Sequence, residues 1–222
     1  MARIYMEENP TSAEARMFKT AKNQEEIVDF YNKVWVHSYD EDLAKKDRKA
    51  PLRFAQFIAK QCQNKNTKIL DLGAGTGLVG KELRELGFTK IDGHDGSDEM
   101  LKKAKDNKVY DAYFVEILEE NKPSTEMPSK SYDCVVTLGC FCPNHLNRNH
   151  LEGIAGLIKT GGLAVLGIRE DDLTEDLNEG MKSLEQRNVW KMEDMFFCED
   201  YECYVEDHSV MLKGYFYAFI VL

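Results

Sequence analysis

The residues best suited to bind a ligand lie in residues 68–86, KILDLGAGTGLVGKELREL. Apolar residues lead to Asp71, and Gly73, Gly75 and Gly77 follow at alternate positions. Apolar residues then recur at helical spacing. A strand that ends in glycines and restarts as a helix leaves a bare turn beside a helix N-terminus, where glycine permits a positive φ and lets a ligand approach the backbone. The stretch therefore predicts a cofactor-binding turn.

Two kinds of cofactor fit this turn, and the position of Asp71 separates them. Gly75, Gly77 and Gly80 match the dinucleotide fingerprint G-x-G-x-x-G, and Asp95 follows Gly75 at the fingerprint's spacing of about 20 residues. In that alignment the first glycine comes four residues after Asp71. In the alternative alignment, Asp71 ends the strand and the glycines form the turn itself. Because a carboxylate there suits a cationic ligand and repels a pyrophosphate, we favour a positively charged cofactor over NAD.

The alignment that begins at Asp71 resembles motif I of the class I S-adenosylmethionine-dependent methyltransferases, whose cofactor carries a sulfonium and an ammonium but no phosphate. The pattern YxxxWxxxYD, which includes Tyr31 and Tyr39, is similar to the helices that precede the core in small-molecule methyltransferases. KTGG at residues 159–162, followed by an apolar run, resembles the family's signature before its fifth strand. The resemblance extends from about residue 25 to the end, and within the class it is greatest to the Williams–Beuren-region methyltransferase-like proteins.

The resemblance implies an α/β fold with a Rossmann-like, seven-stranded, mostly parallel sheet whose last strand is antiparallel. Helices would cover both faces, with a helical addition at the N-terminus. We expect a flexible N-terminal arm over residues 1–22 and a single methyltransferase domain over residues 23–222. Within that domain we expect N-terminal helices (23–66), a cofactor-binding core (67–170), and a C-terminal helix with the last two strands (171–222). The closing GYFYAFIVL is apolar on both faces, which predicts a strand inside the sheet.

Several side chains near the predicted turn are candidates for holding the cofactor. Asp95 leaves the second predicted strand, and a carboxylate there can accept hydrogen bonds from both ribose hydroxyls. The resemblance places Met100 against the adenine, assigns Glu116 and Ile117 to its amino group and ring although the family's usual Asp-Ala pair is absent, and makes the aromatic residues a lid over the methionine end. The complete predicted cofactor set is Tyr31, Tyr39, Asp71, Gly73, Gly75, Gly77, Asp95, Gly96, Ser97, Met100, Glu116, Ile117, Leu138 and Gly139.

The stretch GCFCPNH, residues 139–145, lies where the family places residues that face the substrate. Open α/β sheets also bind ligands beyond the carboxyl ends of their strands. His145 is the candidate general base, because an unperturbed pKa near 6.5 suits proton transfer at neutral pH; alternatively it only lies near the start of the next helix. No N/D-P-P-Y/F sequence occurs here, which argues against enzymes that methylate amino groups of DNA or glutamine. Cys140 and Cys142 lack further ligands at suitable spacing, so we predict no metal site.

Composition restricts the partners and the compartment. The net charge of −10 and the pI of about 5.1 disfavour a nucleic acid as substrate or partner. No apolar run approaches the roughly 20 residues that span a membrane, and the first residues lack the apolar core of a signal peptide. The six cysteines form no C-x-x-C pair, which fits reduced thiols in the cytosol. We therefore expect a cytoplasmic protein with no membrane partner, and a monomer.

Three functions remain open on the sequence. The first is an S-adenosylmethionine-dependent methyltransferase that transfers a methyl group to an unidentified small-molecule or protein acceptor and releases S-adenosylhomocysteine. The second is a non-catalytic S-adenosylmethionine-binding or partner-binding protein of the same fold. The third is an NAD-dependent oxidoreductase, which the position of Asp71 opposes. We favour the first, with rate gained mainly by aligning donor and acceptor.

Overall fold

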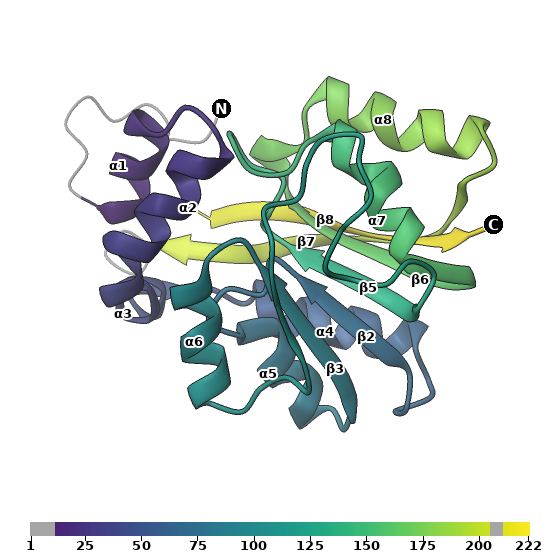
Figure 1. Ribbon diagram of the computed structural model, residues 1–222, viewed down its shortest axis with the longest axis horizontal. Coiled ribbons are helices and arrows are strands. Elements are labelled where there is room, and N and C mark those ends of the chain that lie inside the picture. The colour runs from purple at the N-terminus through teal and green to yellow at the C-terminus, as the bar shows by residue number, and fades with distance from the viewer. Residues whose placement is uncertain (1–11, 205–210) are drawn as a thin grey trace.

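A computed structural model describes residues 12–204 and 211–222, which are arranged around one mixed β-sheet with helices on both faces (Figure 1). The helices are α1 (Ala13–Thr20), α2 (Gln24–Lys33), α3 (Tyr39–Ala44), α4 (Ala50–Gln61), α5 (Leu78–Glu85), α6 (Asp98–Asp106), α7 (Leu151–Leu157) and α8 (Glu175–Gln186). Short 3-10 turns lie at η2 (Trp35–His37), η3 (Arg148–His150) and η4 (Glu170–Asp172). The strands are β1 (Lys46–Asp47), β2 (Lys68–Leu72), β3 (Lys90–Asp95), β4 (Tyr113–Val115), β5 (Tyr132–Leu138), β6 (Ile158–Arg169), β7 (Trp190–Tyr204) and β8 (Met211–Val221).

The strand order across the sheet is β1-β7-β8-β6-β5-β2-β3-β4. Strands β2 to β6 pair in parallel, whereas β8 is antiparallel to both of its neighbours. This confirms the predicted seven-stranded sheet and the interior place of the last strand. The two-residue strand β1, which pairs with the end of β7, is an additional edge strand that the sequence did not predict. The chain adds β3 and β4 on one side of β2 and then β5 and β6 on the other, so the strand order reverses at the β2–β5 boundary, the point at which such sheets bind ligands.

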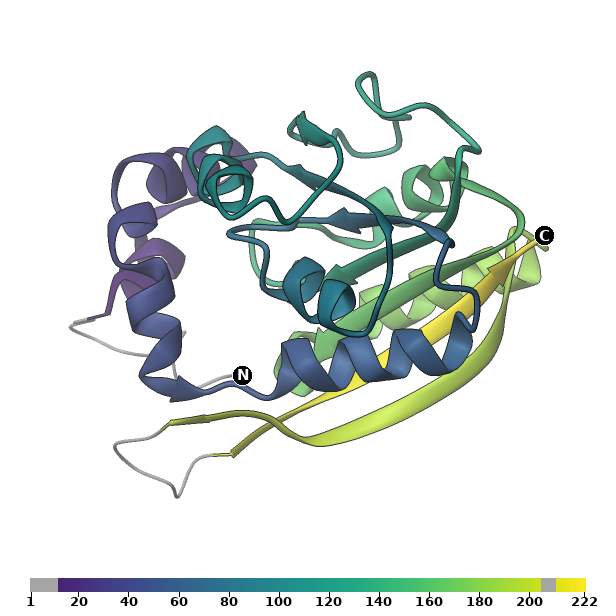
Figure 2. The same cartoon turned by 90° about the horizontal axis from the view of Figure 1, so that it is seen from below.

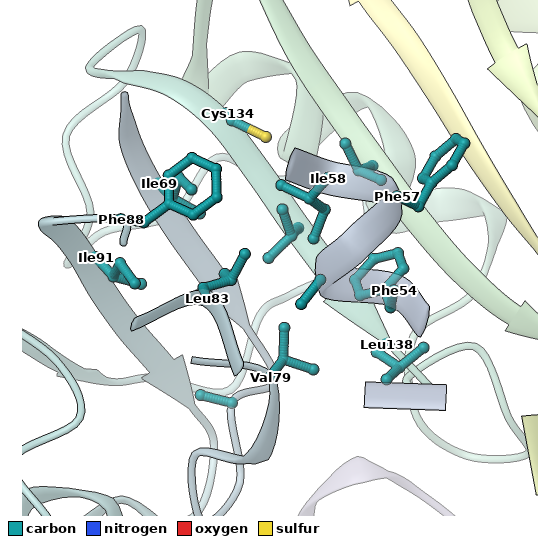
Figure 3. Close-up of a cluster of buried hydrophobic side chains, with 14 of the residues drawn as sticks. Phe54, Phe57, Ile58, Ile69, Val79, Leu83, Phe88, Ile91, Cys134 and Leu138 are labelled. Atoms are coloured by element: carbon teal, nitrogen blue, oxygen red, sulfur yellow. The ribbon is translucent and has the colours of Figure 1, made fainter. Parts of the chain in front are cut away.

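Strand β2 shows why the central strands are apolar on both faces. Successive side chains of a strand point to opposite faces. Ile69 packs in one cluster with residues of α4, α5 and α6, including Ile58 and Leu83 (Figure 3). Leu70 and Leu72 point the other way, into a second cluster with residues of α7 and α8. Both faces of the strand are therefore buried, and the strand ends where the glycines begin.

The N-terminal helices α1 to α3 gather at one end of the sheet in both views (Figures 1 and 2). The predicted arm over residues 1–22 differs from the structure where the two can be compared. Residues 13–20 form α1, which Ser12 caps by accepting a hydrogen bond from the Ala15 N–H at 3.1 Å. Met17 is fully buried in a cluster with Ile27 and Trp35, and Ala13, four positions earlier on the same helix face, belongs to that cluster as well. Residues 1–11 lie outside the described part of the chain.

Two elements are short. Strand β4 contains only Tyr113–Val115, and the side chain of Tyr110 before it is buried. Helix α7 ends at Leu157, since β6 begins at Ile158 opposite Tyr132. Within the described ranges, no helix is long and apolar enough to cross a membrane.

Candidate functional site

The glycine turn after β2 has the backbone that the sequence predicted. Gly73, Gly75 and Gly77 have φ values of +74°, +55° and +95°, a region that favours glycine. The N–H groups of Gly73 and Ala74 both donate to the carbonyl oxygen of His94 at 2.8 Å, which fastens the turn to β3. Gly77 is the N-cap of α5, so the strand, turn and helix follow one another as expected.

Asp95, at the end of β3, lies directly against this turn. Its Oδ2 accepts a hydrogen bond from the Gly75 N–H at 2.8 Å, and its Oδ1 accepts one from the Ser97 N–H at 2.8 Å. Burial raises the pKa of Asp95, and these backbone hydrogen bonds oppose that shift. An ionised carboxylate offers about four lone-pair sites, so Asp95 can still accept further hydrogen bonds. The predicted strand-end acid and the predicted turn therefore form one unit.

A pocket of about 140 Å³ opens beside this unit. Its lining includes Tyr31, Tyr39, Gly73, Gly75, Asp95, Gly96, Met100, Glu116, Ile117, Leu138 and Gly139 from the predicted cofactor set, and the candidate base His145. It also includes Arg48 and His94, which the sequence analysis did not assign to it. The Nδ1 of His94 is buried and has no hydrogen-bond partner among the described residues. Asp71, Gly77 and Ser97 are the predicted cofactor residues outside the lining.

Asp71 faces the protein interior instead of the pocket. It is 2% exposed, and its Oδ2 accepts a hydrogen bond from the Tyr110 hydroxyl at 2.6 Å. Burial raises the pKa of Asp71 to about 7, against the hydrogen bond from Tyr110. The expectation that this carboxylate faces a cationic cofactor is therefore corrected: strand alternation gives Asp71 the same face as Ile69, toward α5 and Tyr110.

Gly77 and Ser97 have local structural roles. A Cβ on Gly77 would lie 3.0 Å from Cγ2 of Val109, so the glycine allows α5 to start close to its neighbour. Ser97 caps α6 by accepting a hydrogen bond from the Met100 N–H at 3.1 Å, and its hydroxyl donates to Oδ1 of Asn32 at 2.6 Å. Ser97 thus joins α2 to the helix that carries Met100 into the pocket.

Glu116 lines the pocket, but its carboxylate is engaged elsewhere. It accepts hydrogen bonds from the hydroxyl of Ser124 and from the N–H and hydroxyl of Thr125. Burial alone would raise the pKa of Glu116, but these hydrogen bonds together have the larger effect. The pKa of Glu116 therefore lies below its ordinary value. The role of its side chain toward adenine stays a prediction.

Aromatic side chains close the side of the pocket formed by α2 and η2. Tyr31 stacks on Trp35 with ring centroids 5.4 Å apart, and Tyr39 meets Trp35 edge-on at 4.9 Å. Burial raises the pKa of Tyr31 well above its usual value and that of Tyr39 to about 12, so both hydroxyls stay protonated at neutral pH. The three aromatic residues of the sequence pattern, Tyr31, Trp35 and Tyr39, therefore lie in contact with one another.

His145 completes the aromatic wall. Its Nδ1 lies 2.9 Å from the carbonyl oxygen of Pro143, which assigns the proton to Nδ1 and leaves Nε2 to accept from the Tyr31 hydroxyl at 3.3 Å. Burial lowers the pKa of His145 to about 4. The imidazole is therefore neutral and only weakly basic at pH 7.

Hydrogen bonds hold the N-terminal helices over the pocket. The Thr76 hydroxyl donates to Oδ1 of Asp40 at 2.7 Å, which links α3 to the glycine turn. On the opposite side, the side-chain amide of Asn144 donates to the carbonyl oxygen of Ala21 at 2.9 Å. Both contacts join the N-terminal layer to loops that follow sheet strands, so this layer forms one wall of the site.

A second cavity, of about 60 Å³, adjoins the pocket and shares four lining residues with it, namely Tyr31, Tyr39, Arg48 and Gly139. Its remaining lining comes from α1, the N-terminal layer and the distal strands, and includes Glu14, Phe18, Cys142, Arg169, Asp172, Tyr201 and Glu202. Cys142 belongs to the stretch of residues 139–145 that the sequence analysis expected to face the substrate. No motif marks the other residues, because they come from segments that meet only in the folded protein.

Comparison with known proteins agrees with the family resemblance seen in the sequence. The family model described as a methyltransferase domain matches residues 69–162. The chain is 30% identical over 169 residues to human Methyltransferase-like protein 27, a match that covers 73% of this chain and 67% of that protein. The chain belongs to the class I S-adenosylmethionine-dependent methyltransferases. Both the class resemblance and the narrower similarity to the Williams–Beuren-region methyltransferase-like proteins are confirmed.

Solved structures show how widely this methyltransferase fold is shared. A TehB-like S-adenosylmethionine-dependent methyltransferase from Corynebacterium glutamicum is similar with a TM-score of 0.57 and 17% identity over 88% of this chain and 98% of that chain. The [4+2]-cyclase SpnF is similar with a TM-score of 0.67 and 12% identity over 90% of this chain and 97% of that chain. At these identities the likeness shows the fold alone, and the second protein is described as a cyclase.

Proposed function

We propose that this methyltransferase binds S-adenosylmethionine in the pocket beside the glycine turn and transfers its methyl group to a small-molecule or protein acceptor. The observation that carries the proposal is the 2.8 Å hydrogen bond between Asp95 and the Gly75 N–H, with both residues in the pocket lining. A cofactor with a ribose can bring its hydroxyls to this carboxylate while its chain passes over the bare glycines. Family membership supports the same cofactor.

The residues around the pocket fit the parts of this cofactor. A Cβ on Gly75 would lie 3.7 Å from Cε of Met100 and 3.9 Å from the Tyr39 hydroxyl oxygen, so the missing side chain leaves the floor of the pocket open. The apolar side chains of Met100 and Ile117 suit the adenine ring, and Asp95 suits the ribose hydroxyls. We assign Leu138, Gly139 and the aromatic wall to the methionine end.

S-adenosylmethionine supplies an electrophilic methyl group on a sulfonium. The chain contributes alignment, because the N-terminal layer and the loop after β5 both line the pocket. Tyr31 and Tyr39 present aromatic rings and protonated hydroxyls to that space. Because an effective general base has a pKa near the working pH, a pKa of about 4 makes His145 a weak base. We propose that His145 mainly orients Tyr31, with general-base catalysis as its alternative role.

Two further functions remained open on the sequence. Family membership sets aside the NAD-dependent oxidoreductase. A non-catalytic S-adenosylmethionine-binding or partner-binding protein of the same fold is the alternative, because a fold by itself does not fix the activity. The predicted cytoplasmic location, the monomeric state and the division into regions stay predictions, which fractionation, analytical ultracentrifugation and limited proteolysis can test.

The first experiment is calorimetric titration of the purified protein with S-adenosylmethionine, S-adenosylhomocysteine and NAD in parallel. We expect micromolar binding of both adenosyl compounds and no binding of NAD. Binding of NAD alone would overturn the proposal. If both adenosyl compounds bind but no methyl group is transferred to any acceptor in a cell extract, the non-catalytic function takes precedence.

A further inference from the structure

The second cavity has the position of an acceptor site. It meets the cofactor pocket at Gly139 and Arg48, and it meets an open cleft of about 660 Å³ at Phe18, Cys142 and Asp172. Cleft, cavity and pocket therefore adjoin one another, with the cavity between the open cleft and the proposed methyl donor. A cavity of about 60 Å³ is well below the roughly 150 Å³ that holds a benzene ring, so it takes a small functional group such as a carboxylate, with the rest of an acceptor in the adjoining cleft.

Two donors at the junction, Nε of Arg48 and the hydroxyl of Tyr201, are buried without a hydrogen bond to any of the described residues, and Tyr201 is 1% exposed. Nε of Arg48 has an ion-pair neighbour, Oε2 of Glu202 at 3.5 Å. Oε1 of Glu202 also makes no hydrogen bond to these residues, but it lies 3.0 Å from Nζ of Lys46. Both side chains approach the same point: a Cβ on Gly139 would lie 3.2 Å from Nη2 of Arg48 and 3.5 Å from the Tyr201 hydroxyl oxygen. Buried polar groups in native proteins usually have partners, so a bound group that accepts hydrogen bonds from both residues explains the arrangement.

The charges around the cavity favour an anionic group over a cationic one. The carboxylates already have cationic neighbours: Glu14 pairs with Lys46, and Asp172 pairs with Arg169 at 3.0 Å. Glu202 lies 3.0 Å from Nζ of Lys46 and 3.5 Å from Nε of Arg48. An ammonium ligand would have to compete with these cations for each carboxylate. A guanidinium carries five N–H donors, so Arg48 retains donors for an anion.

We infer that the second cavity is the acceptor site of this methyltransferase and that it takes a small carboxylic acid, whose carboxylate is held by Arg48 and Tyr201. The inference rests on the proposed function, because the site is an acceptor site only if the neighbouring pocket holds the methyl donor. Arg48 lines both spaces, whereas Tyr201 lines the cavity and not the cofactor pocket. A substitution at Tyr201 therefore tests acceptor binding separately from cofactor binding.

The test uses three probes of similar shape and different charge, namely benzoate, benzamide and benzylamine. Each is titrated by NMR into the full-length protein with and without saturating S-adenosylhomocysteine. Tyr201→Phe removes the hydroxyl and keeps the ring that packs on Phe216, and Arg48→Lys keeps the charge and removes the planar fork. Tyr217→Phe is the matched control, because Tyr217 is also buried in the sheet but lines neither cavity nor pocket.

We expect benzoate to bind more tightly than the other two probes, and Tyr201→Phe and Arg48→Lys each to weaken benzoate binding about tenfold. Tyr217→Phe should leave it unchanged, and Tyr201→Phe should leave S-adenosylhomocysteine affinity within about twofold. Tighter binding of benzylamine than of benzoate would overturn the inference, and so would benzoate binding that is unchanged in Tyr201→Phe. So would an Arg48→Lys variant that loses S-adenosylhomocysteine and not benzoate, since Arg48 would then serve the cofactor. If S-adenosylhomocysteine does not bind but Tyr201-dependent benzoate binding persists, the proposed function fails and the anion site remains without an acceptor role.

Discussion

Replacing Asp95 is the most direct test of how the cofactor is held. Asp95→Ala removes a carboxylate that accepts hydrogen bonds from the Gly75 and Ser97 N–H groups, each at 2.8 Å, and that we assign to the ribose hydroxyls. A hydrogen bond to a charged group contributes about 1.5–3 kcal/mol, and water replaces part of what is lost. We therefore expect S-adenosylhomocysteine binding to weaken by about 1–3 kcal/mol, which raises Kd roughly five- to 150-fold.

The same substitution also removes the partners of the turn, so the assay must separate the two effects. Calorimetric titrations with S-adenosylhomocysteine and with its 2′-deoxy analogue, on wild-type and Asp95→Ala protein, form a thermodynamic cycle. If Asp95 contacts the ribose, removing the 2′-hydroxyl should cost the wild-type protein affinity and cost the variant much less. Asp98→Ala is the control, since it removes an exposed carboxylate three residues away.

Two outcomes would refute the reasoning. Unchanged affinity in Asp95→Ala would remove this carboxylate from the site. Equal losses for both ligands, with no coupling between the substitution and the 2′-hydroxyl, would show that Asp95 supports the glycine turn without contacting the ribose.

Three further predictions concern the turn, the buried acid and the N-terminal layer. Gly75→Val should abolish S-adenosylmethionine binding in calorimetry while the protein stays folded by circular dichroism, because the new side chain fills the space beside Met100; retained binding would contradict the turn assignment. Asp71 has a pKa of about 7 in the folded state against 3.8 for the free group, so the folded state binds the proton more tightly. The contribution of Asp71 to the unfolding free energy therefore falls as pH rises from about 4 to 7. Subtracting urea-unfolding curves of Asp71→Asn from those of the wild type should reveal this fall, at most about 4 kcal/mol, and a pH-independent difference would disprove it. Met17→Ala should loosen α1 because it empties a fully buried position, so hydrogen exchange over residues 13–20 should accelerate; unchanged exchange would mean that α1 does not depend on this contact.

The sequence alone predicted most residues of the proposed cofactor site. Gly73, Gly75 and Asp95 could be predicted because strand, turn and helix are local elements, and positive φ values restrict the turn to glycine. The apolar last strand likewise predicted its place inside the sheet, since only a strand covered on both faces has no need of polar residues. The direction of the Asp71 side chain could also have been predicted from the sequence, because strand alternation places it on the face of Ile69.

Most of the proposed acceptor site was decided by the tertiary structure, although residues 139–145 were already expected to face the substrate. Arg48 and Tyr201 are 153 residues apart, and neither belongs to a motif. They meet because the two-residue strand β1 pairs with the end of β7, in the register Lys46 opposite Tyr204. A strand that short has no periodic pattern to detect, and its partner is chosen by the sheet edge that the rest of the fold leaves open. The pairing brings a guanidinium, a phenol and a carboxylate to the junction of two cavities, which no local sequence feature could foretell.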